Sequence, residues 1–248
     1  MRLTSALVLG LVALSLAQNP PPPKPPVVLL SLPMGLPVGQ TTPVELRGQR
    51  LDSITEVTAS LGKVKLLAKD KVAVPNGLDA SRIGDTRVRL EYTAPDNTPA
   101  DASAEVTFTL TAPEGKATAK VLLETAAVIA EKEPNDSFKQ AQPIRLGDTV
   151  AGVIGWVQDV DVYRFTGKKG QRVQIEVIAA RRGSGLDAFL SVYDDKGQLL
   201  QSIDDVDGSR DARLTLILPR DGQYHIVLSD ADDTGGPTHV YRLMLAAK

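Results

Sequence analysis

Alternation of apolar and polar residues dominates the chain from Val27 onward. Short runs such as 88–92 and 106–110 alternate with period two, and clusters of Pro, Asn, Asp and Gly such as 95–99 separate them. Period two places successive side chains on opposite faces of a strand, so these runs predict half-buried β-strands. The pattern therefore predicts an all-β protein.

The strand pattern falls into two blocks, which predict two β-sandwich domains. Over residues 27–127, about a hundred residues of short strands and turns predict an immunoglobulin-like sandwich. Over residues 128–248, strands resume, and hairpin turns at 195–197 and 220–222 predict a second antiparallel sandwich of jelly-roll type. The composition changes from alternating strand to an acidic run at 125–132, so we place the boundary there.

The N-terminal residues predict export. Arg2, an apolar stretch over 6–16 and a small-x-small site ending at Ala17 are typical of a signal peptide over 1–17. The apolar stretch is short for a membrane span. Residues 18–26 are Pro-rich and predict an extended spacer, although an ordinary disordered N-terminus explains them as well. We expect a secreted or periplasmic protein without a membrane span.

Composition narrows the possible functions. The chain has no cysteine, so its stability has to come from a large core, from bound ions or from both. Its 28 basic and 30 acidic residues nearly cancel, and no basic block occurs. This balance argues against nucleic acid as the main partner.

An acidic run halfway along the chain is the first candidate for chemistry. It offers four oxygen ligands within six residues: Glu131, Glu133, Asn135 and Asp136. In an extended segment the first three side chains point the same way. A dense set of oxygen ligands suits calcium, which takes six to eight of them with loose geometry. The alternative is that these residues cap a short helix beginning near Ser137.

A second acidic pair follows downstream. Period two places Asp159, Asp161, Tyr163 and Phe165 on one face of a strand. Burying two unpaired carboxylates beside core aromatic residues would cost several kcal/mol. We therefore expect Asp159 and Asp161 at the mouth of the strand, where they can meet a cation.

The order of motifs resembles a known family. Glu-x-Glu-Pro-Asn-Asp-Ser-Phe at 131–138 is followed by Ala-Gln-Pro-Ile at 141–144, Asp-Val-Asp-Val-Tyr-Arg-Phe at 159–165 and Asp-Gly-Gln-Tyr at 221–224. This sequence resembles the bacterial pre-peptidase C-terminal domain, a secreted β-sandwich module also known from the collagen-binding segments of collagenases. The resemblance covers about residues 131–248. It implies calcium (Ca²⁺) bound by Glu131, Glu133, Asn135 and Asp136, with Asp159 and Asp161 as downstream partners.

Two further acidic loops, 204–211 and 230–233, invite comparison with calcium loops. Counted from Asp205, Arg210 stands where an EF-hand requires glycine, and Leu216 stands where it requires a bidentate Glu. We therefore expect solvated acidic loops at both places. Whether either holds a second ion stays open.

Nothing in the sequence indicates catalysis. There is no nucleophile elbow and no zinc-binding His-Glu-x-x-His motif, and His225 is expected on the outer face of a strand. We therefore predict that the protein is not an enzyme.

The predicted function is binding. We expect an exported, non-catalytic, calcium-binding β-sandwich protein that binds or anchors to an extracellular protein or polysaccharide. The alternatives are a structural spacer of a cell-envelope assembly and an accessory to a secreted peptidase that acts in trans.

Overall fold

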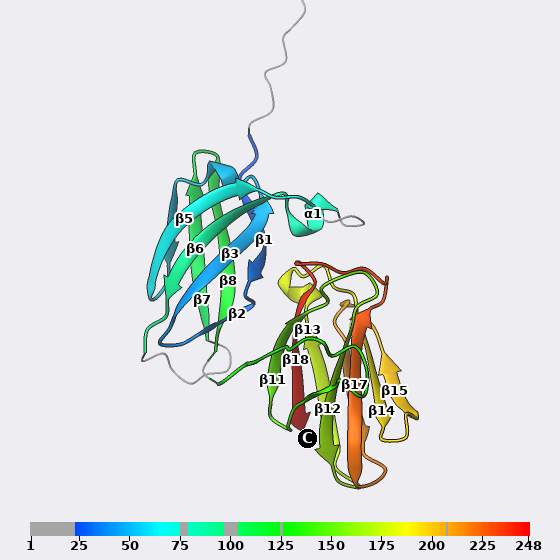
Figure 1. The fold of residues 1–248 in the computed structure, drawn as a ribbon. Helices are drawn as coiled ribbons and strands as arrows, with labels where there is room; N and C mark the ends of the chain where they lie inside the picture. Colours follow the sequence, from blue (N-terminus) through cyan, green and yellow to red (C-terminus); the bar gives the residue numbers. More distant parts are fainter. Residues whose placement is uncertain (1–22, 75–78, 97–103, 125, 207) are drawn as a thin grey trace, which may run out of the picture.

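The architecture was obtained from a computed structural model, which describes residues 23–74, 79–96, 104–124, 126–206 and 208–248. The predicted signal peptide (1–17) and the first part of the predicted spacer (18–22) lie outside these residues. Two β-sandwiches follow one another along the chain (Figure 1). The prediction of an all-β protein with two sandwiches is thus confirmed.

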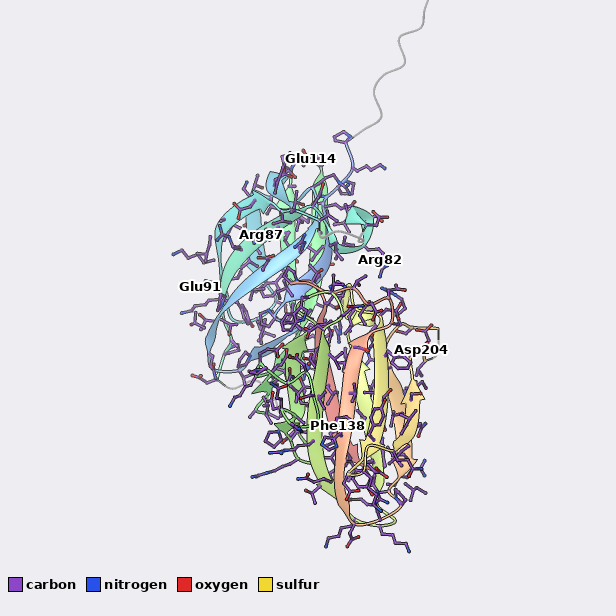
Figure 2. All side chains as sticks on the ribbon, turned by 45° about the vertical axis from the view of Figure 1, so that its right-hand side comes forward. Arg82, Arg87, Glu91, Glu114, Phe138 and Asp204 are labelled. Carbon is purple, nitrogen blue, oxygen red and sulfur yellow. The ribbon has the colours of Figure 1, made fainter. Side chains whose placement is uncertain are left out.

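The first sandwich consists of two four-stranded sheets, with strand orders β1-β3-β6-β5 and β2-β8-β7-β4. In β7 every second side chain is buried, as its alternating sequence predicts. β6 belongs to the other sheet, and its residues Arg87 and Glu91 lie on the outer face of that sheet (Figure 2). The strands are β1 Val27–Leu32, β2 Gly35–Pro37, β3 Thr41–Gln49, β4 Glu56–Ala59, β5 Lys63–Lys71, β6 Thr86–Thr93, β7 Glu105–Ala112 and β8 Gly115–Glu124, with the short helices η1 Leu51–Ser53 and α1 Ala80–Ile83.

The second sandwich consists of two five-stranded sheets, with strand orders β10-β12-β17-β14-β15 and β16-β13-β18-β11-β9. The short 3-10 helix η2, Ala180–Arg182, follows β13. The strands are β9 Ile129–Ala130, β10 Gln142–Pro143, β11 Thr149–Val153, β12 Val160–Gly167, β13 Arg172–Ile178, β14 Ala188–Asp194, β15 Leu199–Ile203, β16 Arg213–Ile217, β17 Gly222–Asp230 and β18 Val240–Ala247.

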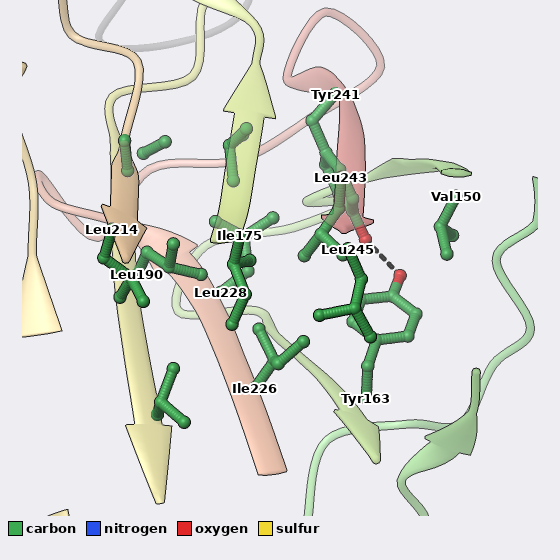
Figure 3. Close-up of a cluster of buried hydrophobic side chains, with 14 of the residues drawn as sticks. Val150, Tyr163, Ile175, Leu190, Leu214, Ile226, Leu228, Tyr241, Leu243 and Leu245 are labelled. Atoms are coloured by element: carbon green, nitrogen blue, oxygen red, sulfur yellow. Dashed lines mark hydrogen bonds between the residues drawn. The ribbon is translucent and has the colours of Figure 1, made fainter. Parts of the chain in front are cut away.

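The core of the second sandwich forms where the inner faces of its two sheets meet (Figure 3). Branched aliphatic residues fill most of it, and Ile175, Leu228 and Leu243 are fully buried. Two tyrosines lie at one side of this cluster, Tyr163 and Tyr241, and their hydroxyl groups are 2.5 Å apart. A buried hydroxyl group needs a polar partner, so this pair marks a polar position at the rim of the core.

One expectation about the second sandwich was wrong. We expected only antiparallel strands, but β9 pairs in parallel with β11, and β10 pairs in parallel with β12. The incoming linker causes this difference, because it contributes a two-residue strand to the edge of each sheet. The acidic run 131–136 lies between these two strands.

The two sandwiches contact each other through charged pairs. Arg182 of η2 pairs with Glu105 of β7 at 2.8 Å, and Arg242 of β18 pairs with Glu124 of β8 at 2.6 Å. The second pair is largely buried, with 10% and 13% of the two side chains exposed. Beside it runs a groove of about 770 Å³ that Glu131 and Tyr241 also line. The acidic linker therefore lies directly at the junction of the two sandwiches.

Candidate metal centre

The linker is fixed to the second sandwich by backbone and amide contacts. The amide N–H of Glu131 donates to the carbonyl of Ala151 over 3.0 Å, which continues the pairing of β9 with β11. On the other side, the Gln142 side chain accepts from the N–H of Lys132 (2.8 Å) and donates to the carbonyl of Ala130 (3.0 Å). These contacts bring the acidic run to the edge of both sheets.

Five of the predicted ligands come together as two groups of carboxylates. Glu131, Glu133 and Asp161 form one group, and Glu133, Asp136 and Asp159 form the other. Within each group, the chosen carboxylate oxygens all lie within 4.8 Å of one another. Glu133 belongs to both groups. The structure thus places side chains from the linker beside Asp159 and Asp161 at the start of β12.

Asn135, the sixth predicted ligand, lies fully buried beside the first group. Its Nδ2 donates to Glu131 Oε1 over 3.4 Å, and its own N–H donates to Glu133 Oε2 over 3.0 Å. Its Oδ1 is buried and has no hydrogen-bond partner. The helix that Asn135 was alternatively expected to cap is missing, since 138–140 form only a turn.

Asp161 is the most deeply placed of the carboxylates. It is fully buried, and only its Oδ2 accepts a hydrogen bond, from the Tyr241 hydroxyl group at 2.5 Å. Its Oδ1 is buried without a partner. Burial, followed by its interaction with Glu131, raises the pKa of Asp161 to about 10. This raised pKa favours the protonated form of the carboxyl group when no cation is bound.

Asp159 lies immediately before β12 and organises the turn in front of it. Its Oδ2 accepts from the N–H of Gly155 at 2.5 Å, and its Oδ1 accepts from the N–H of Val160 at 2.9 Å. Burial raises the pKa of Asp159, and the charges of Glu131 and Asp136 raise it further. The pKa of Glu133 is also raised, first by burial and then by its acidic neighbours.

The distances within the two carboxylate groups can be compared with those of a calcium site. Calcium–oxygen bonds are about 2.3–2.6 Å long, so two oxygens on one ion lie at most about 5 Å apart. Both carboxylate groups meet that limit. None of the ion pairs between described residues involves one of these five acids. The two unpartnered oxygens, on Asn135 and Asp161, are hard ligands of the kind calcium takes.

Sequence reasoning missed the hydroxyl groups behind Asp161. Tyr241 donates to Asp161 and lies 2.5 Å from the Tyr163 hydroxyl group, so a short polar chain leads from the carboxylates into the core. Period two placed Tyr163 on the same face as Asp161, but it assigned no role to the Tyr163 hydroxyl group. Tyr241 comes 80 residues after Asp161, and no spacing rule connects them.

The two other acidic loops are not fully solvated, which corrects the expectation for 204–211 and 230–233. Asp211 is buried and accepts from the N–H of Ala179 at 2.9 Å. Asp230 is buried and accepts from the N–H and hydroxyl groups of Thr234 at 3.0 and 2.9 Å. Asp204, Asp205, Asp232 and Asp233 are exposed, as expected. Both buried acids anchor loops, and each also accepts from an N–H group of another segment, Ala179 for Asp211 and Asp187 for Asp230.

A buried group of Asp230, Thr234 and His239 lacks the geometry of a catalytic triad. In a triad, the hydroxyl and the carboxylate bind opposite ring nitrogens. Here His239 Nε2 lies 2.9 Å from the Thr234 hydroxyl and 4.0 Å from Asp230, whereas Nδ1 has no partner. All three groups hold the loop after β17 together.

His225 lies on the outer face of β17, as expected, but it is only 7% exposed. Phe138 covers it, with stacked rings whose centroids are 4.4 Å apart. Phe138 itself lies on the outside of the second sandwich (Figure 2). Burial lowers the pKa of His225, which is consistent with a packed rather than a catalytic role.

Comparisons with known proteins agree with the motifs. Residues 159–230 match the bacterial pre-peptidase C-terminal domain family. A probable subtilase-type serine protease of Deinococcus radiodurans is 39% identical over 103 residues, which are 40% of this chain and 14% of the protease. The chain therefore spans a small part of the length of that relative.

Two solved structures are similar to about half of this chain. The pre-peptidase C-terminal domain of a Bacillus anthracis collagenase is 18% identical, with a TM-score of 0.34, and the match covers 46% of this chain and 99% of that domain. A periplasmic inhibitor of g-type lysozyme from Aeromonas hydrophila is also 18% identical, with a TM-score of 0.34, over 49% of this chain and 96% of the inhibitor.

In the part of the chain that the structure describes, no helix is long and apolar enough to cross a membrane. The matched family is a non-catalytic β-sandwich module found in secreted proteases. Motifs, the family match and the fold agree for the same part of the chain. The second sandwich therefore contains the segment, residues 159–230, that matches the bacterial pre-peptidase C-terminal domain family.

Proposed function

We propose that the protein is an exported, non-catalytic binding module that calcium stabilises at the junction of its two sandwiches. The observation that supports this best is the pair of carboxylate groups that share Glu133 and have no basic ion-pair partner among the described residues. Calcium would supply positive charge and additional ligand positions at this place. Glu131, Glu133, Asn135, Asp136, Asp159 and Asp161 would hold it.

The expected effect of the ion is mechanical. Glu131 lies in the linker directly after β9, and Asp161 and Asp159 belong to the second sandwich. Binding by both sides draws the linker onto the sandwich. Since Glu131 also lines the groove beside the Arg242–Glu124 pair, fixing the linker restricts how the two sandwiches move relative to each other. Without the ion, those acids that remain ionised repel each other and loosen the linker.

We infer a binding or accessory role because the matched domain is a non-catalytic module and the relative is a protease. A module of this kind can hold a protease close to an extracellular protein or polysaccharide. We propose that the protein performs this role in trans, as an accessory to a secreted peptidase. The competing proposal is a structural spacer without a ligand.

Thermal unfolding of the full chain in EDTA and across a calcium titration tests the calcium proposal. The melting temperature should rise with calcium in the wild type. The rise should be lost in Glu133→Ala and Asp136→Ala. Magnesium at the same concentration should have a much smaller effect. A melting temperature that ignores calcium in all three proteins would refute the site.

Co-sedimentation with insoluble collagen and with cellulose, in calcium and in EDTA, tests the binding role. Retention on one polymer that calcium strengthens would support a polymer-binding module. If the protein stays in solution with both polymers and also fails to change the activity of an added secreted subtilisin, the structural-spacer proposal is favoured.

A further inference from the structure

The turn between β11 and β12 presents the one tryptophan of the chain to solvent. Trp156 is 51% exposed and Val157 is 68% exposed. Among the described residues, they are the only exposed large hydrophobic side chains that are adjacent in sequence. Single exposed apolar residues are common, but a paired tryptophan and valine at the tip of a turn is an unusual surface.

Contacts from both sides hold this turn rigidly. Asp159 accepts from the N–H of Gly155, and its own N–H donates to the Trp156 carbonyl over 3.3 Å. The N–H of Gln158 donates to the Asp233 carbonyl over 3.2 Å. Gly235 packs so closely that an added Cβ would lie 1.9 Å from the Trp156 carbonyl oxygen. A fixed apolar tip loses little conformational entropy when it binds a partner.

The surroundings of the turn are acidic on two sides. On one side, Asp159 groups with the exposed residues Glu133 and Asp136. On the other side lie the exposed residues Asp232 and Asp233, and the Asp233 carbonyl accepts the hydrogen bond from the N–H of Gln158. Such a field repels anionic partners and attracts cationic ones. In addition, an aromatic face surrounded by acids is a favourable position for a lysine or arginine side chain.

We propose that the Trp156–Val157 turn is a docking point for a protein partner that presents a basic side chain beside an aliphatic one. The aliphatic side chain packs on Val157, and the lysine or arginine lies over the Trp156 ring, close to Asp232 and Asp233. This inference deepens the binding role proposed above and rests on it. It names the chemistry of the partner segment and the surface that receives it.

Because Trp156 is the sole tryptophan, its fluorescence reports on this turn directly. The probes are two five-residue peptides, acetyl-Leu-Lys-Leu-Arg-Leu-amide and acetyl-Leu-Glu-Leu-Glu-Leu-amide, titrated into the full chain. We expect a saturable blue shift with the basic peptide and about tenfold weaker binding of the acidic one. Val157→Ser and the double variant Asp232→Asn/Asp233→Asn should each weaken binding of the basic peptide by roughly tenfold.

Ile217→Ser is the matched control. Ile217 is 65% exposed and pairs with Arg172 at the start of β13, at the opposite end of the sandwich. This variant should bind the basic peptide like the wild type. The proposal is overturned if neither peptide shifts the emission or if both bind equally. It is also overturned if phosphatidylglycerol vesicles or a chitin oligosaccharide shift it more strongly than the basic peptide does. The calcium-dependent rise in melting temperature is measured separately, so failure here leaves the calcium proposal standing.

Discussion

Two buried aspartates at the same end of the second sandwich are satisfied in different ways. Asp230, the last residue of β17, accepts four hydrogen bonds of 2.9–3.1 Å from the N–H groups of residues 187, 232 and 234 and from the Thr234 hydroxyl group. Asp161, the second residue of β12, accepts one from Tyr241, and its Oδ1 has no hydrogen-bond partner. Their exposures, 3% and 0%, are nearly equal.

The difference lies in the neighbours rather than in burial. Asp230 is surrounded by N–H and O–H donors, which supply the positive partial charge that a buried carboxylate needs. Asp161 is surrounded by other carboxyl groups, which leave it to take up a proton or a cation. We therefore expect the first aspartate to be structural in every condition, and the second to depend on calcium and pH.

The largest expected effect comes from removing the carboxylate of Asp230, which accepts four hydrogen bonds. Asp230→Ala leaves several buried donors unpaired, which should lower the free energy of unfolding by about 3–5 kcal/mol. Urea denaturation measures this loss. It should be the same in calcium and in EDTA, because the hydrogen bonds of Asp230 among the described residues involve no member of the two carboxylate groups. A loss of unfolding free energy that appears only in calcium would contradict the purely structural role given to Asp230.

The next effect is that of calcium on the wild type. At a free calcium concentration 100 times the dissociation constant, a single site stabilises the folded state by about 2.7 kcal/mol. In Asp161→Asn the stabilisation should disappear, whereas the exposed-residue control Asp232→Asn should keep it. Differential scanning calorimetry of the three proteins in EDTA and in calcium makes the measurement. Equal calcium effects in wild type and Asp161→Asn would contradict the assignment of Asp161.

A third effect is the pH dependence of the calcium-free protein. The pKa of Asp161 is raised to about 10 in the folded state, above its ordinary value of 3.8, so the folded protein binds more protons than the unfolded protein between these pH values. Stability from this group is therefore complete below about pH 4 and is lost as the pH rises towards 10. In EDTA, the melting temperature should decline between pH 5 and pH 9 more steeply in the wild type than in Asp161→Asn. Parallel curves would show that Asp161 titrates normally.

The smallest effect is expected from the hydroxyl group behind the site. Tyr241→Phe removes the one hydrogen bond that Asp161 accepts and should cost about 1 kcal/mol in EDTA. In calcium the cost should be no larger, because the ion would satisfy the carboxylate. Urea denaturation of Tyr241→Phe in both conditions decides this point. A larger loss in calcium would mean that Tyr241, rather than Asp161 itself, supports binding of the ion.

Much of the fold could be predicted from local pattern. The strands around Ile175, Ile226 and Leu243 follow from period two, and the turn at 195–197 correctly predicted the connection between β14 and β15. The parallel edge strands β9 and β10 could not be predicted, since each has only two residues and gains its partners from the tertiary structure. Strands this short have no readable period.

The candidate site shows the same division. Glu131, Glu133, Asn135 and Asp136 are close in sequence, so their spacing alone predicts a cluster of oxygen ligands. Side chains that meet only through folding were interpreted wrongly or overlooked. Asp211 and Asp230 were expected in water, although the N–H groups of Ala179 and Asp187, in other segments, donate to them. Tyr241 was overlooked.

Titration calorimetry of calcium binding at pH 6 and pH 8, in buffers with different ionisation enthalpies, tests the central claim most directly. We expect saturable binding to the full chain that releases protons, is tighter at pH 8 than at pH 6 and is absent in Asp161→Asn. Wild-type protein that takes up no calcium, or an Asp161→Asn variant that binds it as tightly with the same proton release, would contradict the calcium site proposed at the junction.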